Sequence, residues 1–345
     1  MSGPTAYVAR PETKRVVALV VALTGLICTM LVLFAWPAAN SAPRDLPIVI
    51  AGPRASTGPL TERLVIQQPS AYAIHLAPTR ADAVRSITDH DAYGALVTSP
   101  HGVEVLTASA RSSSVAQLLD QVGARAAATA HQPLRMTDVV PAPADDPHGT
   151  GITSAVLPSV LAGLACASLS TVLIRRRGDR TLVAAGFSIV GGLAMAAVLQ
   201  GWIGTLEGPF VANAAVLALT LGAISMIVLG LESLFGTRGL GVGAVLTMLV
   251  GNALSAAASA PEMLPIGWGA LGQLLPAGAA NTALRSVAFF GGNGSARPLA
   301  VLTCWLVVGL GLQVGAAQRR RRPAESTSSE RDTEVTELQH AHAAV

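Results

Sequence analysis

The sequence predicts an all-α membrane protein, a bundle of six spanning helices with a small α/β extracytoplasmic domain inserted after the first helix. Hydrophobic residues make up 51% of the 345 residues and charged residues 12%, whereas a soluble domain carries about 25% charged residues. Several apolar runs reach about 20 residues, the length that crosses a hydrocarbon core of about 30 Å. Between the first two runs lies a polar stretch, residues 38–150, with strand-like and helix-like patterns.

Six apolar runs have the length of a spanning helix. They are Val16–Trp36, Ile152–Ile174, Thr181–Leu206, Pro209–Leu231, Gly239–Ala258 and Pro298–Ala317. The first also resembles a signal peptide with a cleavage site near Ala38–Asn40. It is longer than the usual apolar region of such a peptide and ends in aromatic residues, so we expect a membrane anchor over residues 16–37.

The basic residues near the ends of the runs predict the orientation, because cytoplasmic loops carry the excess of Lys and Arg. On one side of the membrane lie Arg10, Lys14, Arg15, Arg175, Arg176, Arg177, Arg180, Arg238 and Arg319–Arg322. The short loops on the other side carry only Arg285 and Arg297. We therefore expect a multi-pass protein of a bacterial plasma membrane. Both termini (residues 1–15 and a disordered tail, 318–345) would be cytoplasmic and residues 38–150 would lie outside.

The inserted stretch predicts a compact α/β domain with the order β-α-β-α-β-β-α-β. Strands are expected at residues 46–52, 71–77, 93–98, 103–107 and 136–140, and helices at 59–67, 79–89 and 113–129. Thr79-Arg-Ala-Asp82 resembles a capping box that opens the second of these helices. Pro141–Gly149 is expected to link the domain back to the five remaining helices, residues 151–317.

Motifs of known catalytic chemistry are missing from the sequence. A phosphate-binding loop needs GxxxxGK[ST], but the only lysine is Lys14, at a membrane edge. Asp89-His90-Asp91 is the one cluster of metal-ligand types, and three adjacent residues do not converge readily on one ion, so a solvated turn is the favoured interpretation. We predict no catalytic residue, no cofactor, no metal and no nucleic-acid partner, and a chain that is not an enzyme.

The outer segment, residues 259–297, is apolar but broken by proline and glycine, as in APEMLPIGWGALGQLLPAGAANTALR. We expect short helices that lie in the outer interface, or a re-entrant segment covered by protein or water. The residues expected to line a pathway or an outer gate are Asn252, Trp268, Gln273, Asn281 and Arg285. Asn281 and Arg285 are four residues apart and would share one helix face, while Asn252 fits a hydrogen bond between helices equally well.

The layout of one span, an outside domain and five further spans resembles the ABC-2 type transporter permeases. It is most similar to their phage-infection-protein-like (YhgE/Pip) branch. The resemblance is carried by ADAVRSITDHDAYGALV and VEVLTASARSSSVAQLLDQV in the insert, and by PEMLPIGWGALGQLLPAGAANTALRSV before the last span. It covers most of residues 16–317, and the family is recognised by layout more than by invariant residues.

The resemblance implies a homo- or heterodimeric permease that contacts membrane lipid and exports a lipophilic or cell-envelope substrate with a separate ABC ATPase subunit. By position, Arg175, Arg176, Arg177 and Arg180 would contact that ATPase, although a topology anchor explains these arginines equally well. The GxxxG patterns Gly239–Gly243 and Gly311–Gly315 indicate close packing within the chain or a dimer interface. The alternative function is a membrane scaffold or receptor whose outside domain binds an envelope partner.

Overall fold

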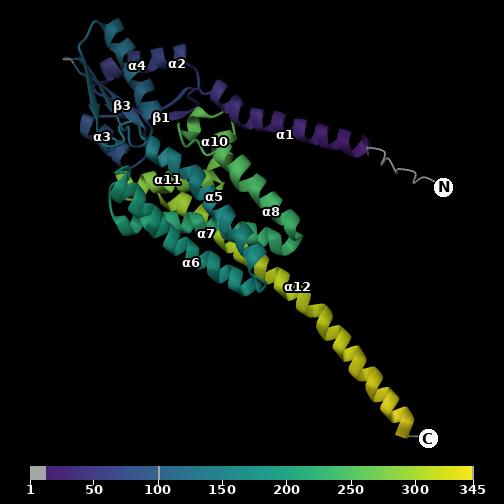
Figure 1. Cartoon of the computed structure of the whole chain (residues 1–345). Helices are drawn as coiled ribbons and strands as arrows, with labels where there is room; N and C mark the ends of the chain where they lie inside the picture. Colours follow the sequence, from purple (N-terminus) through teal and green to yellow (C-terminus); the bar gives the residue numbers. More distant parts are fainter. Residues whose placement is uncertain (1–12, 100–101, 344–345) are drawn as a thin grey trace, which may run out of the picture.

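The computed structural model describes the backbone of residues 13–99 and 102–343 and the side chains of residues 15–99 and 102–319. The expected N-terminal segment therefore lies largely outside the described residues. An α/β unit sits at one end of a helical bundle (Figure 1). Five helices are long and apolar enough to cross a membrane: Arg15–Ala39, Thr150–Leu173, Arg177–Trp202, Phe210–Phe235 and Ala296–Arg319. These helices indicate a multi-pass membrane protein.

The α/β unit confirms the element order predicted from the sequence. Its strands are β1 (Leu46–Ala51), β2 (Tyr72–Ala77), β3 (Gly94–Ser99), β4 (Gly102–Thr107) and β5 (Leu134–Asp138). Its helices are α2 (Arg54–Gln67), α3 (Arg80–Thr88) and α4 (Ser113–Ala130). The sheet has the order β2-β1-β3-β4-β5. All neighbouring strands are parallel except β3 and β4, which pair antiparallel.

The two faces of the sheet bury different partners, because successive side chains of a strand point to opposite sides. Leu46, Ile48 and Ile50 of β1 share one core with α2 and α4. Val49 and Ala51 share the other core with α3. Each core also takes residues from the outer segment, including Met263 on the first face and Phe290 on the second. The sheet therefore packs directly on the broken segment of the bundle.

The bundle is built around α7 (Phe210–Phe235), which is apolar on all sides and 78% buried over its most apolar 18 residues. A helix that is hydrophobic all round belongs in a protein or membrane interior. Around it lie α5 (Thr150–Leu173), α6 (Arg177–Ala196) with its π-helical end η1 (Ala197–Trp202), and α12 (Ala296–Ala343). We call the end beside the α/β unit the domain end and the opposite end, at Ile174–Arg176 and Gly236, the far end (Figure 1).

The fifth predicted span, Gly239–Ala258, is shorter than expected. It consists of α8 (Thr237–Ala244), the π-helix η2 (Val245–Val250) and α9 (Gly251–Ala253), with 8, 6 and 3 residues. Ser255 ends the helix by donating its amide and its hydroxyl to the Asn252 carbonyl, at 3.3 and 2.8 Å, and Ala256 then takes a positive φ of 53°. The observed bundle thus has five long apolar helices and one short helical segment in place of six equal spans.

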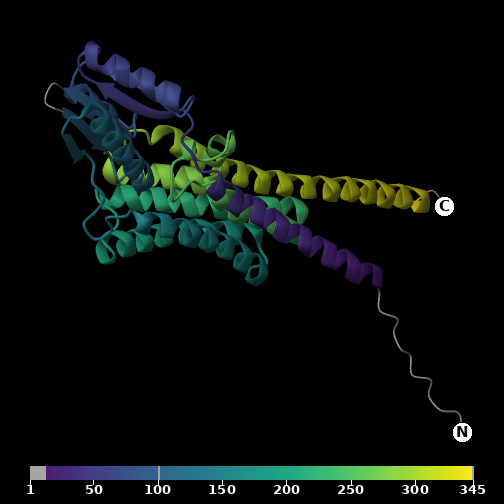
Figure 2. The same ribbon diagram turned by 90° about the horizontal axis from the view of Figure 1, so that it is seen from above.

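The first and last helices project from the rest of the molecule. The spanning part of α1 (Thr13–Ala39) buries none of its most apolar window inside the protein. Helix α12 continues well past the bundle in both views (Figures 1 and 2). It runs without interruption to Ala343, so the disorder expected after Arg322 is replaced by helix. After Arg322 the tail contains four Glu and four Ala, residue types with high intrinsic helix propensity.

The outer segment forms three short helices between α9 and α12. They are η3 (Pro261–Met263), α10 (Trp268–Gln273) and α11 (Pro276–Phe289). Helix α11 packs against α5, α7 and α12, and its residues Ala279, Ala283 and Ser286 are fully buried. The segment is therefore folded into the domain end of the bundle.

Candidate functional site

The α/β unit, the outer segment and the bundle meet at one place, which we call the junction. Its centre is Arg285 on α11, whose side chain is buried, with 6% of its surface exposed. Its Nη1 donates to the carbonyl of Ala110 at 3.0 Å and to that of Arg111 at 3.3 Å, both in the α/β unit. Its Nη2 donates to the Ala257 carbonyl at 3.2 Å and to the Thr153 hydroxyl of α5 at 3.4 Å. One guanidinium thus joins three parts of the chain.

Arg285 remains positively charged although its side chain is buried. Burial lowers its pKa to about 10, while the nearby Tyr93 and Asp146 favour the charged form. Asp146 also caps the start of α5, since its carboxylate accepts from the amides of Thr150 at 2.8 Å and Gly151 at 2.7 Å. A carboxylate in this position satisfies the first amides of a helix and complements its dipole. The predicted pairing on one face of α11 is confirmed, because Arg285 Nε donates to Asn281 Oδ1 at 3.3 Å.

A second set of contacts holds η3 against the sheet. The Tyr93 hydroxyl donates to Glu262 Oε2 at 2.8 Å. The Arg111 guanidinium carbon lies 3.8 Å from the centre of the Tyr93 ring, a distance typical of a cation–π contact. Arg44 donates to the carbonyls of Met263 and Leu264 at 3.2 and 2.9 Å. These contacts hold the beginning of the outer segment against the α/β unit.

The loop after α11 holds the other face of the sheet. The His90 and Phe290 rings meet edge to face with centroids 4.8 Å apart. Asn293 Nδ2 donates to the Thr88 carbonyl at 3.1 Å. Burial, with the charge of Arg111 as the next cause, lowers the pKa of His90 to about 3. The imidazole is therefore neutral, and Asp89-His90-Asp91 forms a docked turn; within the described residues there is no cluster of three or more metal-ligand side chains.

A cavity of about 450 Å³ opens at the junction, between the α/β unit, α10 and the start of α12. Its charged lining consists of Arg44, Arg111, Arg297, Asp45 and Glu262. Gln273 also lines it; its Oε1 accepts from the Thr282 hydroxyl at 2.7 Å, while its Nε2 is buried without a hydrogen-bond partner. The cavity is a concave site of the junction that combines charged and apolar lining residues.

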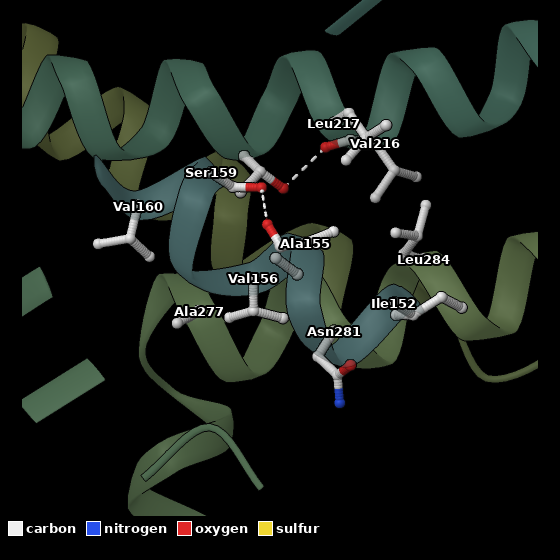
Figure 3. A pocket seen from close by; sticks show the side chains of 12 residues that line it. Ile152, Ala155, Val156, Ser159, Val160, Val216, Leu217, Ala277, Asn281 and Leu284 are labelled. Carbon is white, nitrogen blue, oxygen red and sulfur yellow. Dashed lines mark hydrogen bonds between the residues drawn. The ribbon is translucent and has the colours of Figure 1, made fainter. Parts of the chain in front are cut away.

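Inside the bundle, a second cavity lies between α5, α7 and α11 and holds about 20 Å³, the space of about one water. Figure 3 shows its apolar walls, among them Ile152, Val156 and Leu284. The Ser159 hydroxyl donates to the Ala155 carbonyl of its own helix at 2.6 Å. Asn281 lies at its edge. The cavity is too small to pass a substrate.

The predicted gate residues separate into two groups. Gln273, Asn281 and Arg285 belong to the junction or to the cavity beneath it. Trp268 begins α10 but does not line the larger cavity, whereas its neighbours Gly267 and Gly269 do. Asn252 lies in the short helix α9, lines neither cavity, and uses its carbonyl to end that helix.

The basic loop at the far end also separates into two pairs. Helix α6 begins at Arg177, so Arg177 and Arg180 lie in its first turn. Arg180 Nη1 is 3.2 Å from Glu232 Oε2, and Arg177 Nη2 is 3.9 Å from Glu232 Oε1. Arg175 and Arg176 are exposed. The first pair thus neutralises the buried Glu232 at the end of α7, and the second pair is free to meet a partner.

Sequence analysis did not single out Tyr93, Arg111, Glu262 or Asp146 for the junction. Glu262 and Arg285 are the only charged residues of the Pro/Gly-broken stretch from Ala260 to Arg285. That isolation is the signal that could have marked Glu262 as a docking residue. In comparisons of the chain with protein-family descriptions, curated proteins and solved structures, no match was found.

Proposed function

We propose that the chain is the membrane-spanning subunit of an export system that moves a lipophilic or cell-envelope substrate outward, as its resemblance to ABC-2 type permeases implies. The observation that carries the proposal is the broken segment α10–α11, folded into the domain end of the bundle. Irregular backbone at membrane depth is tolerated only where protein or water covers it. Interrupted helices of this kind build substrate sites in transporters. A helix that only anchors an outside domain needs no such segment.

The packed interior of the bundle favours a substrate path along the outer surface of the protein. The cavity between α5, α7 and α11 holds about one water, and 78% of the most apolar part of α7 is buried. A substrate would therefore move along the outer surface of the bundle, between two copies or between the chain and lipid. The path between two copies corresponds to the homo- or heterodimer that the resemblance implies, and α1, whose apolar window is not buried in the chain, would take part in it.

An external ATPase would act on the far end, which we place in the cytoplasm. We assign its contact to Arg175 and Arg176, which are exposed, and not to Arg177 and Arg180, which hold Glu232. The orientation follows from the same basic residues. The α/β unit and the junction cavity then lie outside, where a substrate would leave.

The test is purification of the tagged chain from its native membranes, followed by measurement of ATP hydrolysis by the complex. We expect the wild type to retain an ATPase subunit and the double variant Arg175→Gln, Arg176→Gln to lose most of it without a change in thermal stability. A control double variant, Arg63→Gln, Arg125→Gln, changes two exposed arginines of the α/β unit and should retain it. A wild type that carries no ATPase, or equal retention by both double variants, would contradict the proposal.

A further inference from the structure

The donors that line the junction cavity are not all satisfied. Arg111 Nε and Gln273 Nε2 are both buried and have no hydrogen-bond partner among the described residues. A buried donor without a partner costs about 1–3 kcal/mol. Arg297 is exposed and makes no ion pair or hydrogen bond with any described residue. All three groups are donors, so the group that would satisfy them is an acceptor.

The net charge of the cavity also favours an anionic ligand. Three arginines face two carboxylates, Asp45 and Glu262, and burial keeps His90 neutral by lowering its pKa to about 3. Glu262 accepts from Tyr93, and Arg44 donates to backbone carbonyls. The cavity is left with a formal charge of +1. Arg297 is its uncommitted cation, and Arg111 donates through Nη1 to the Ala92 carbonyl at 2.9 Å while its Nε has no partner. One singly charged oxyanion balances that charge.

The amino end of α12 also favours an anionic ligand in the cavity. Gly294, Arg297 and Pro298 all line the cavity, and they lie at the amino end of a helix whose spanning part alone has 24 residues. The amino end of a helix carries partial positive charge and free amides, and therefore attracts anions. Arg111 Nε and Gln273 Nε2, which are buried without an acceptor, favour an anion in the same place if their side chains rotate toward the cavity.

An exposed apolar side chain also lines the cavity. Ile266, just before α10, is 89% exposed. An exposed apolar side chain beside charged residues at a membrane interface suits an acyl chain that enters the outer leaflet. The oxyanion and the acyl chain together describe one amphiphile.

We propose that the junction cavity binds the phosphodiester headgroup of a singly charged anionic lipid, held by Arg111, Arg297 and Gln273, with its acyl chains leaving along Ile266. This inference rests on the proposed export function, of which it names the substrate class. A water-soluble phosphate ester offers the same oxyanion without the acyl chains, so binding of the two must be compared.

The test is native mass spectrometry of the purified full-length protein with added dioleoyl phosphatidylglycerol, dioleoyl phosphatidylcholine or glycerol 3-phosphate. We expect phosphatidylglycerol to bind about tenfold more tightly than phosphatidylcholine and glycerol 3-phosphate to compete weakly. Arg297→Gln should weaken phosphatidylglycerol binding about fivefold, and Gln273→Met by a similar factor. Arg238→Gln changes an exposed arginine at the far end and should leave binding unchanged.

Equal binding of the two lipids, or equal losses in Arg297→Gln and Arg238→Gln, would overturn the inference. Glycerol 3-phosphate that competes as strongly as the lipid would overturn the assignment to a lipid. Arg297 has no partner to lose, so its variant remains informative if Gln273→Met unfolds. The binding measurement needs no ATPase: lipid binding without transport would contradict only the proposed function, and transport without this binding would contradict only the present inference.

Discussion

At the residue scale, Arg285 determines whether the α/β unit stays on the bundle. Its guanidinium supplies the donors for the carbonyls of Ala110, Arg111 and Ala257. We predict that Arg285→Met, which keeps the volume and removes every donor, lowers the free energy of unfolding by about 3 kcal/mol, because buried acceptors lose their partners. Thermal unfolding and protease cleavage of the 110–112 loop measure the effect. Arg297→Gln, which removes no contact, should match the wild type in both; equal sensitivity of the two variants would refute this role.

His90 makes the same junction sensitive to acid. Its pKa falls from 6.5 to about 3 on folding, so the unfolded chain binds more protons between these values and stability falls as pH decreases. Between pH 6.5 and pH 5 the loss reaches about 2 kcal/mol at most, at 1.36 kcal/mol per pH unit. We predict that His90→Asn, which tolerates the φ of 70° at this position, removes that part of the pH dependence. Melting curves at pH 7.5 and pH 5 should show a smaller difference in the variant; an unchanged difference would assign the effect to another group.

At the scale of elements, the two GxxxG patterns have different surroundings. A Cβ at Gly239 would lie 2.2 Å from the Leu231 carbonyl oxygen, whereas nothing lies within 4 Å of a Cβ at Gly311 or Gly315. The first pattern lets α8 pack on α7, and the second faces outward on α12. Packing within the chain therefore explains the Gly239–Gly243 pattern but not the Gly311–Gly315 pattern.

Alanine substitutions distinguish these surroundings. We predict that Gly239→Ala destabilises the protein by about 1–3 kcal/mol, the usual cost of forcing atoms into a packed interface. Gly311→Ala should be neutral or slightly stabilising, because alanine is the better helix former by up to about 1 kcal/mol. Thermal unfolding in detergent compares the two matched variants. A neutral Gly239→Ala would show that α8 moves away from α7 without cost.

Local patterns explain why the elements of the α/β unit could be predicted while the junction could not. The expected cap at Thr79 forms, with its side chain accepting from the Asp82 amide at 3.2 Å, because both residues lie within one turn. The contact of Tyr93 with Glu262 joins residues 169 positions apart, and that of Arg285 with Ala110 spans 175. No periodicity relates such positions. The early end of α9 depends likewise on a Ser255 hydroxyl that a hydropathy pattern does not register.

At the scale of the whole molecule, basic residues lie next to the ends of the spanning helices at the far end. Arg175, Arg176, Arg238 and Arg319 are all exposed, and the connection from α5 to α6 and the start of α8 lie at the end of the bundle away from the α/β unit (Figure 1). The domain end carries the junction, where Arg285 is buried and Arg297 borders the cavity. A bilayer around the bundle would separate these two ends, and the positive-inside tendency would place the far end in the cytoplasm.

Labelling in intact cells tests this orientation. In a chain with Cys28, Cys166 and Cys304 replaced by Ala, a cysteine at the exposed Gln121 of α4 and one at the exposed Arg176 mark the two ends. We predict that a membrane-impermeant maleimide labels Gln121→Cys in intact cells and Arg176→Cys only after the membrane is permeabilised, because the bilayer excludes the reagent from the far end. Labelling of both after permeabilisation shows that both thiols can react. The reverse pattern in intact cells would place the α/β unit in the cytoplasm, and the junction cavity could then no longer serve as the exit for an exported lipid.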